Sequence, residues 1–322
     1  MGTAVFESVA ALFGGCVGSF LNVVIHRLQF DDPQRRSLGG RSHCPHCGAL
    51  IRWFDNVPVL SWVLLRARGR CCKRPIAMRY PLVELLTAGL FGALAHWSPF
   101  AGALTADASG QAMGIAVAGL VLQAVFLSLL VALSFIDFDT QLLPDVLTKP
   151  GIAIGLLGGL WPGVAGSISQ DDSTSLALRT LLASLAGFVV GGGFTWLIRA
   201  VGSKVFGREA MGFGDVKLMA MVGAFLGWQA ALLTMFLGCV IGAVVGGLGA
   251  ALGRGTVIPF GPYLALGAVV SLFLREPILT LVFSTWPEWQ RRNPSSQWLL
   301  LAFASGSLLL LFFVVRRGRR PS

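Results

Sequence analysis

Two aspartates stand where long apolar segments end or begin. Asp137 closes one such segment in "SFIDFDTQLLPD", and Asp215 opens another in "MGFGDVKLMA". Ionisable side chains at membrane depth are costly and usually functional. Two facing carboxyl groups can share one proton and activate water, one acting as a base while the other polarises a peptide carbonyl. The two aspartates are therefore candidates for the hydrolysis of a peptide bond.

Small and basic residues accompany Asp215 in its segment. Gly212 and Gly214 permit a close backbone approach, as an extended substrate beside Asp215 would require. We group Lys217 with these glycines as residues expected to contact the substrate or to form the backbone of the active site. The segment is not a dinucleotide-binding glycine motif, because no strand precedes it and no βαβ unit follows.

Two further acids, Asp139 and Asp145, are expected at the same membrane edge, but each has a simpler interpretation. Asp145 follows Pro144 and stands where a helix cap is expected. Asp139 is explained as a solvated residue at a helix exit. A helix cap is also the alternative for Asp215, although its flanking glycines weigh against it.

The six cysteines divide into two groups. Cys16 and Cys239 lie in apolar runs, where cysteine packs as a small apolar residue. The others lie in a basic segment: Cys44, Cys47, Cys71 and Cys72. We expect that segment in the reducing cytoplasm, where metal binding is favoured over disulfides.

A zinc site is the specific prediction for the second group of cysteines. The Cys-x-x-Cys spacing of Cys44 and Cys47 in "HCPHC" suits one side of a tetrahedral zinc site. Cys72 is the expected third ligand, and the fourth is open, since Cys71, His43 or His46 could supply it. The alternative is a reduced, metal-free loop held by packing.

The composition defines the elements that must position these residues. Hydrophobic residues make up 55% of the 322 residues, and charged residues only 12%, against about 25% in a typical soluble domain. The apolar runs are continuous rather than alternating, which excludes a β-barrel. The fold class is therefore an all-α polytopic membrane protein, with about eight to nine transmembrane helices and a small cytoplasmic Cys-containing insert. The expected spans cover about 5–25, 82–97, 114–136, 150–166, 178–199, 216–227, 230–252, 257–274 and 298–315.

The placement of charge predicts the orientation. The net charge is +10, and eleven of the 25 Lys and Arg residues lie in 27–80. Positive residues favour the cytoplasmic side, so a basic surplus here indicates topology and not nucleic-acid binding. The insert, the carboxyl pair and the C-terminal "RRGRR" are then cytoplasmic, and the 275–297 linker is outside.

Six segments carry a resemblance to a known family. They are "GSFLNVVIHRL", "HCPHCGALIRWFDNVPVLSWVLLR", "RYPLVELL", "SFIDFDTQLLPD", "EAMGFGDVKLMAMVGAFLGW" and "IPFGPYLALG". Together, and in this order from about residue 14 to 270, they resemble the signature segments of type IV prepilin peptidases. These are bifunctional leader peptidases and N-methyltransferases of the GxGD aspartic protease class.

The resemblance implies a function and its residues. Asp137 and Asp215 match the family's catalytic aspartates. The expected reaction is cleavage of type IV prepilins or type II secretion pseudopilins after a Gly, at the cytoplasmic face of the bacterial inner membrane. S-adenosylmethionine then methylates the new N-terminal residue, usually Phe. A proton-coupled transporter and a non-catalytic secretion-assembly protein are the alternatives.

The resemblance fits the cysteine segment less completely. The family usually has a second Cys-x-x-Cys before "PI"; Cys72 matches its later cysteine, but the earlier position holds Gly69, and this chain has Cys71 instead. No S-adenosylmethionine site is recognisable. Glu84 in "RYPLVE" is a possible cofactor residue, and a buried polar contact explains it equally well.

The expected domains follow from these motifs. Residues 1–26 form the first transmembrane helix, and 27–80 a cytoplasmic zinc-ribbon-like domain linked to methyl transfer. Residues 81–274 form the membrane-embedded peptidase domain. Residues 275–322 are an extension with one extra transmembrane helix.

Overall fold

The computed structural model describes residues 3–29, 39–40, 42–98, 101, 110–160, 173–207, 209, 211–252, 259–293 and 298. Eight helices carry most of the described chain: α1 (Thr3–Leu28), α3 (Arg79–Trp97), α5 (Gly110–Thr140), α6 (Asp145–Gly158), α7 (Ser173–Phe206), α8 (Phe213–Leu226), α9 (Trp228–Ala251) and α10 (Gly261–Thr280). Only two isolated antiparallel bridges occur in the described part. The all-α prediction is confirmed.

Five helical segments are long and apolar enough to cross a membrane. They are Thr3–Leu28, Met113–Thr140, Leu178–Val205, Trp228–Gly249 and Gly261–Arg292. Helices α6 and α8 have 14 residues each. At about 1.5 Å per residue they extend about 21 Å, less than the ~30 Å hydrocarbon core. These two helices depend on their neighbours for burial.

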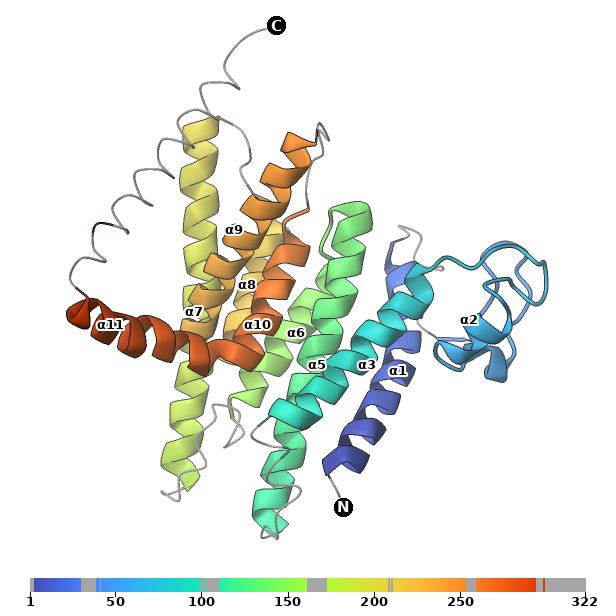
Figure 1. Cartoon of the computed structure of the whole chain (residues 1–322), viewed down its shortest axis with the longest axis horizontal. Coiled ribbons are helices and arrows are strands. Elements are labelled where there is room, and N and C mark those ends of the chain that lie inside the picture. The colour runs from blue at the N-terminus through green and yellow to red at the C-terminus, as the bar shows by residue number, and fades with distance from the viewer. Residues whose placement is uncertain are drawn as a thin grey trace, which may run out of the picture. The chain divides into compact units, whose positions relative to one another are not determined.

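Helices α1, α3 and α5 lie side by side (Figure 1). Glycines permit the close approach of α1 and α3: a Cβ at Gly18 would lie 2.8 Å from the Glu84 Cα, and one at Gly14 would lie 2.7 Å from the Phe91 Cβ. Small residues allow membrane helices to pack in this way. Apolar side chains of all three helices form one core cluster: Leu21, Val24, Ile25, Leu28, Val83, Val131, Ala132 and Ile136.

Helix α8 is the buried centre of the second core cluster. From Asp215 to Phe225, every residue except Lys217 is buried, as expected of a helix that is apolar all round. Side chains of α5, α9 and α10 pack on it, and it also contacts α6 and α7. Gly227, with φ +83°, makes the turn into α9, at the position that the sequence predicted.

The segment between α1 and α3 has little regular structure. It contains a 3₁₀ turn, η1 (Trp53–Asn56), the short α2 (Leu60–Leu64) and the two β-bridges, His43–Leu50 and Arg68–Pro75. In Figure 1 it lies beside α1 and α3.

The chain divides into two compact units, Met1–Phe273 and Leu274–Ser322. Within the second unit, the π-helical turn η2 (Leu281–Thr285) and α11 (Trp286–Arg292) follow α10 without a break. The mixed linker expected at 275–297 is therefore helical as far as Arg292. The predicted ninth span and the "RRGRR" tail lie outside the described residues, apart from Trp298.

Candidate active site

The two candidate aspartates lie close together inside the helical bundle. Asp137 stands in the last turn of α5 and is 5% exposed, and Asp215 stands in the first turn of α8 and is 8% exposed. Asp137 acts electrostatically on Asp215. In the part of the chain that the structure describes, neither carboxyl group has an ion-pair partner. Helix α8 begins at Phe213 with Gly212 as its N-cap, so Asp215 is not the cap residue.

The N-terminus of α10 holds Asp137. The Gly261 N–H donates a hydrogen bond of 3.1 Å to the Asp137 Oδ2. A Cβ at Gly261 would lie 2.5 Å from that oxygen, so a larger residue would displace the carboxyl group. Gly261 lies in the "IPFGPY" segment that the sequence analysis quoted, but nothing in the sequence alone pairs this glycine with a residue 124 positions earlier.

The neighbouring acids are neutralised by basic partners. Asp139 forms an ion pair with Arg79 at the start of α3 and also accepts a hydrogen bond from Gln29. Asp145 forms ion pairs with Lys149, at 2.8 Å, and with Lys217. Both acids thus have basic partners at the helix ends, whereas Asp137 and Asp215 have no ion-pair partner among the described residues.

Three residues near Asp215 were grouped with it from the sequence, namely Gly212, Gly214 and Lys217, and each makes different contacts. Gly214 packs on the α5–α6 connection, where its Cβ would come within 2.9 Å of the Leu143 Cβ. This contact explains the glycine without a substrate. Among the described residues, a Cβ at Gly212 would meet Asp215 Oδ2 and Gly214 N within 4 Å. Lys217 joins α8 to α6 through Asp145, and its Nζ lies 5.2 Å from the centre of the Phe213 ring.

Four cysteines gather in the segment between α1 and α3. The sulfur atoms of Cys44, Cys47, Cys71 and Cys72 all lie within 4.8 Å of one another. Cys44 and Cys72 are 3.8 Å apart, and Cys47 and Cys71 are 3.3 Å apart. Sulfurs bound tetrahedrally to zinc at about 2.3 Å are about 3.8 Å apart. Among the described residues no histidine joins the group, so the geometry favours Cys71 over His43 and His46 as the fourth ligand.

The two cysteine pairs occupy similar turns. The Cys44 N–H donates to the Ala49 carbonyl in the first turn, and the Gly69 N–H donates to the Arg74 carbonyl in the second. Relative to the bridges His43–Leu50 and Arg68–Pro75, Gly69 takes the place of Cys44, and Cys72 that of Cys47. A Cβ at Gly69 would lie 3.8 Å from the Cys72 sulfur and 4.0 Å from the Cys71 sulfur. Cys71 therefore brings its sulfur to the region that Gly69 leaves free.

The cluster includes a readily ionised thiol. Burial opposes ionisation of Cys44, but hydrogen bonds from the backbone N–H groups of His46 and Cys47 and from neighbouring thiols lower its pKa to about 7. Hydrogen bonding with Cys47 and then Cys44 raises the pKa of Cys71 to about 12. Metal binding would release the remaining protons. The donor set therefore fits a thiophilic cation such as zinc.

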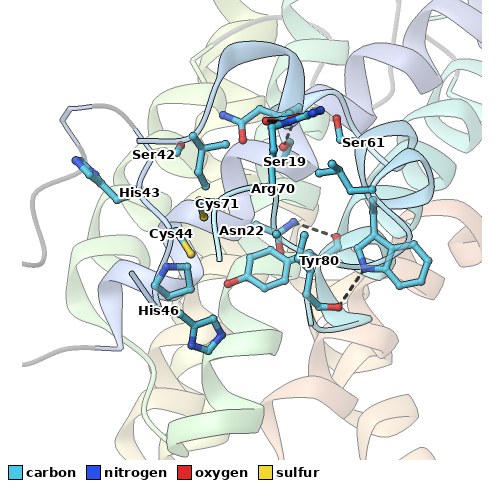
Figure 2. Close-up of a pocket in the computed structure, with 18 of the residues that line it drawn as sticks. Ser19, Asn22, Ser42, His43, Cys44, His46, Ser61, Arg70, Cys71 and Tyr80 are labelled. Atoms are coloured by element: carbon cyan, nitrogen blue, oxygen red, sulfur yellow. Dashed lines mark hydrogen bonds and ion pairs between the residues drawn. The ribbon is translucent and has the colours of Figure 1, made fainter. Parts of the chain in front are cut away.

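A cavity of about 690 Å³ lies beside the cysteine cluster. Residues of α1, of α3 and of the segment between them line it, including the buried Glu84. Figure 2 shows His43, Cys44 and His46 on one side of the cavity and Ser61 on the other, with Asn22 and Tyr80 between them.

The fold and the carboxyl pair together define a polytopic membrane protein with a site like that of an aspartic peptidase. The profile of the bacterial peptidase A24 N-terminal domain matches residues 12–98, and that of the type IV leader peptidase family matches residues 124–247. No solved structure matches the chain significantly.

Curated relatives extend the match over most of the chain. A prepilin leader peptidase/N-methyltransferase of Aeromonas hydrophila is 38% identical over 299 residues, which covers 85% of this chain and 92% of the relative. One of Burkholderia pseudomallei (strain 1026b) is also 38% identical, covering 85% and 87%. One of Myxococcus xanthus is 43% identical over 238 residues, covering 73% and 60%. The chain belongs to the family of prepilin leader peptidases/N-methyltransferases, as its signature segments predicted.

Proposed function

We propose that this chain removes the leader peptide of type IV prepilins or type II secretion pseudopilins and methylates the new N-terminus. Cleavage follows a Gly at the cytoplasmic face of the bacterial inner membrane. The observation that carries the proposal is the pair of buried carboxyl groups, Asp137 and Asp215, without basic partners among the described residues. The names of the relatives support the substrate and both activities. A transporter or a non-catalytic assembly protein has no such support.

The peptidase reaction uses the two carboxyl groups as an acid–base pair. One carboxylate takes a proton from water, and the water oxygen bonds to the carbonyl carbon of the scissile peptide. The other, protonated, polarises the carbonyl oxygen. The C–N bond then breaks, and the leaving amine takes up a proton. Gly261 holds Asp137 in position for this step through its N–H, and Gly212, which has no side chain, permits a close approach of the substrate backbone to Asp215.

The second activity requires S-adenosylmethionine. When bound, this cofactor supplies the methyl group: its C–S bond breaks, a C–N bond forms to the amine, and the amine loses a proton. The N-terminal profile match, residues 12–98, contains the cysteine segment and the cavity. We assign methyl transfer to this part of the chain.

The four cysteines would hold a structural zinc ion in the 27–80 domain. That domain has few buried apolar residues of its own between α1 and α3, so a metal bound to both turns would stabilise it. The peptidase domain is then 81–274. The role of 275–322 as an extension with one further span stays a prediction.

We place the site at the cytoplasmic edge of the membrane. Contacts of Asp139 with Gln29 and Arg79 bring the ends of α1, α3 and α5 to one edge, where the basic segment 27–80 also lies. Basic segments favour the cytoplasm. Membrane lipid surrounds the bundle, and the basic charge needs no nucleic-acid partner.

The test is leader cleavage by purified protein in detergent, with a prepilin as substrate. Asp137→Asn and Asp215→Asn should each abolish cleavage, while Asp139→Asn, which removes an ion-paired carboxylate on the same helix as Asp137, should retain it. Full cleavage by either of the first two variants would refute the assignment.

A further inference from the structure

The cavity beside the cysteine cluster contains a buried acid that the peptidase site does not use. Glu84 is 8% exposed and lines the cavity from α3. Its Oε2 accepts a hydrogen bond of 2.7 Å from the Val59 N–H. In the described part of the chain no basic side chain forms an ion pair with Glu84, whereas Asp55, the other acid lining the cavity, is paired with Arg70 at 2.9 Å.

A buried carboxylate without a counter-charge is costly. One interpretation is structural, since Glu84 holds Val59, a β-branched residue with φ +60°. That role needs only a hydrogen-bond acceptor and not a negative charge. A cation in the cavity would explain why the acceptor is a carboxylate.

The rest of the lining suits a ligand that combines positive and negative groups. Arg52 and Arg74 line the same cavity as Glu84, together with the aromatic rings of Trp62 and Tyr80. A volume of about 690 Å³ lies within the range of small-molecule sites, about 300–1,000 Å³. An amino-acid-like ligand with a cationic centre, a carboxylate and an aromatic base matches this set of groups.

The cavity also lies near the edge that carries the carboxyl pair. Tyr80, which lines the cavity, directly follows Arg79, and Arg79 forms its ion pair with Asp139, two residues after Asp137. An amine released by cleavage at the carboxyl pair therefore emerges at the membrane edge where the cavity is found.

We propose that this cavity binds S-adenosylmethionine and that Glu84 provides the negative charge opposite its sulfonium group. The proposal rests on the N-methyltransferase function proposed above and adds its binding site. In this proposal Glu84 contacts the methyl donor. The affinity for S-adenosylmethionine then depends on the Glu84 carboxylate, whereas the affinity for S-adenosylhomocysteine, which is neutral at sulfur, does not.

Binding of two ligands to the full chain in detergent tests the proposal. S-adenosylmethionine carries the sulfonium charge, and S-adenosylhomocysteine is neutral at sulfur. Glu84→Gln keeps an acceptor for the Val59 N–H but removes the charge. It should weaken S-adenosylmethionine binding about tenfold or more and change S-adenosylhomocysteine binding by less than about threefold.

Glu7→Gln is the matched control. Glu7, on α1, pairs with His96 of α3 at 2.9 Å and does not line the cavity, so both affinities should stay at the wild-type value. An equal loss of both ligands in Glu84→Gln, or no loss of either, would overturn the proposal. The proposal would also be overturned if the wild-type chain methylates a cleaved prepilin while the Glu84→Gln variant binds S-adenosylmethionine as tightly as the wild type.

Leader cleavage separates this proposal from the broader one. Glu84→Gln should cleave a prepilin at the wild-type rate, which also shows that the variant is folded. If the wild type cleaves and methylates while Glu84→Gln binds the donor normally, the cavity is not the donor site, and the proposed function still holds. A wild-type chain that neither cleaves nor methylates refutes the proposed function itself.

Discussion

Asp137 and Asp139 stand two positions apart on α5, and their surroundings differ. Side chains two residues apart on a helix do not share a face. Asp139 reaches Arg79 and Gln29 at the end of the bundle, while Asp137 faces the interior, where the α10 N-terminus and Asp215 lie. Burial without a basic partner therefore distinguishes the proposed catalytic residue from its neighbour.

Gly261 positions the Asp137 carboxyl group, and its substitution by alanine tests this role. Gly261→Ala places a methyl group 2.5 Å from the Asp137 Oδ2 and should displace the carboxyl group. Loss of a hydrogen bond to a charged group costs about 1.5–3 kcal/mol, so kcat should fall about tenfold or more. KM should change little, because the added methyl group acts on the position of the Asp137 carboxyl group. Steady-state cleavage kinetics measure both.

Gly242→Ala is the control for this variant. Its Cβ would make ordinary contacts, 3.5 Å from Tyr263 and 3.6 Å from Phe260, near the same helix end. It should cleave normally. Wild-type kcat in Gly261→Ala would show that the N–H of Gly261 does not position Asp137.

The aspartates could be predicted from the sequence, but their environment could not. Their place at the ends of apolar runs identified Asp137 and Asp215. The hydrogen bond from Gly261 depends on how α10 packs against α5, and sequence spacing carries no information on that contact. Asp137 ends its own helix but faces the N-terminus of α10, whereas Asp215 lies in the first turn of its own helix, α8.

Among the elements, α7 and α8 approach each other closely at Gly187 and Gly223. A Cβ at Gly187 would overlap the Gly223 carbonyl oxygen, and a Cβ at Gly223 would overlap that of Gly187. Gly187→Ala should therefore separate the helices and lower the free energy of unfolding by about 1–3 kcal/mol. Thermal unfolding in detergent measures the effect.

Gly193→Ala, on the same helix α7, meets nothing within 4 Å and should unfold at the wild-type temperature or slightly above it. Equal stability of the two variants would contradict the close crossing.

The cysteine turns give a prediction about metal binding. The wild-type chain should carry about one zinc ion, and Cys71→Ser should lose most of it. Cys71→Ser combined with Gly69→Cys should regain the metal, because Gly69 occupies the turn position of Cys44 and faces the sulfurs. Elemental analysis of protein prepared without chelator measures the content.

Cys16→Ser, which changes a cysteine outside the cluster, should keep its zinc. Metal retained in Cys71→Ser would instead point to His43 or His46. No zinc in the wild-type chain would reject the site.

The presence and order of most helices could be predicted from hydropathy, and the exceptions have a physical cause. The predicted spans correspond to α1, α3 and α5–α10. Hydropathy alone does not distinguish the short α8, buried on all sides, from a helix that faces lipid, because both are apolar all round. The expected spans 216–227 and 230–252 place a turn near Gly227, and the structure has it there with φ +83°, which glycine permits. The helical stretch up to Arg292 was not predicted, because its mixed charges resemble those of a linker.

At the scale of the whole molecule, contacts between distant segments build one functional edge. Arg79 with Asp139, Lys217 with Asp145 and Gly261 with Asp137 connect the ends of α3, α5, α6, α8 and α10. The same edge lies next to the cavity and the cysteine cluster. Proximity of the two proposed sites would let a cleaved substrate be methylated without crossing the membrane.

The most direct test of the central claim is the intact mass of a prepilin co-expressed with this chain. With the wild type, the prepilin should lose its leader and gain the mass of one methyl group. With Asp137→Asn or Asp215→Asn, it should keep both the leader and an unmodified N-terminus. A prepilin fully processed by either variant would contradict the assignment of the two aspartates as the catalytic pair.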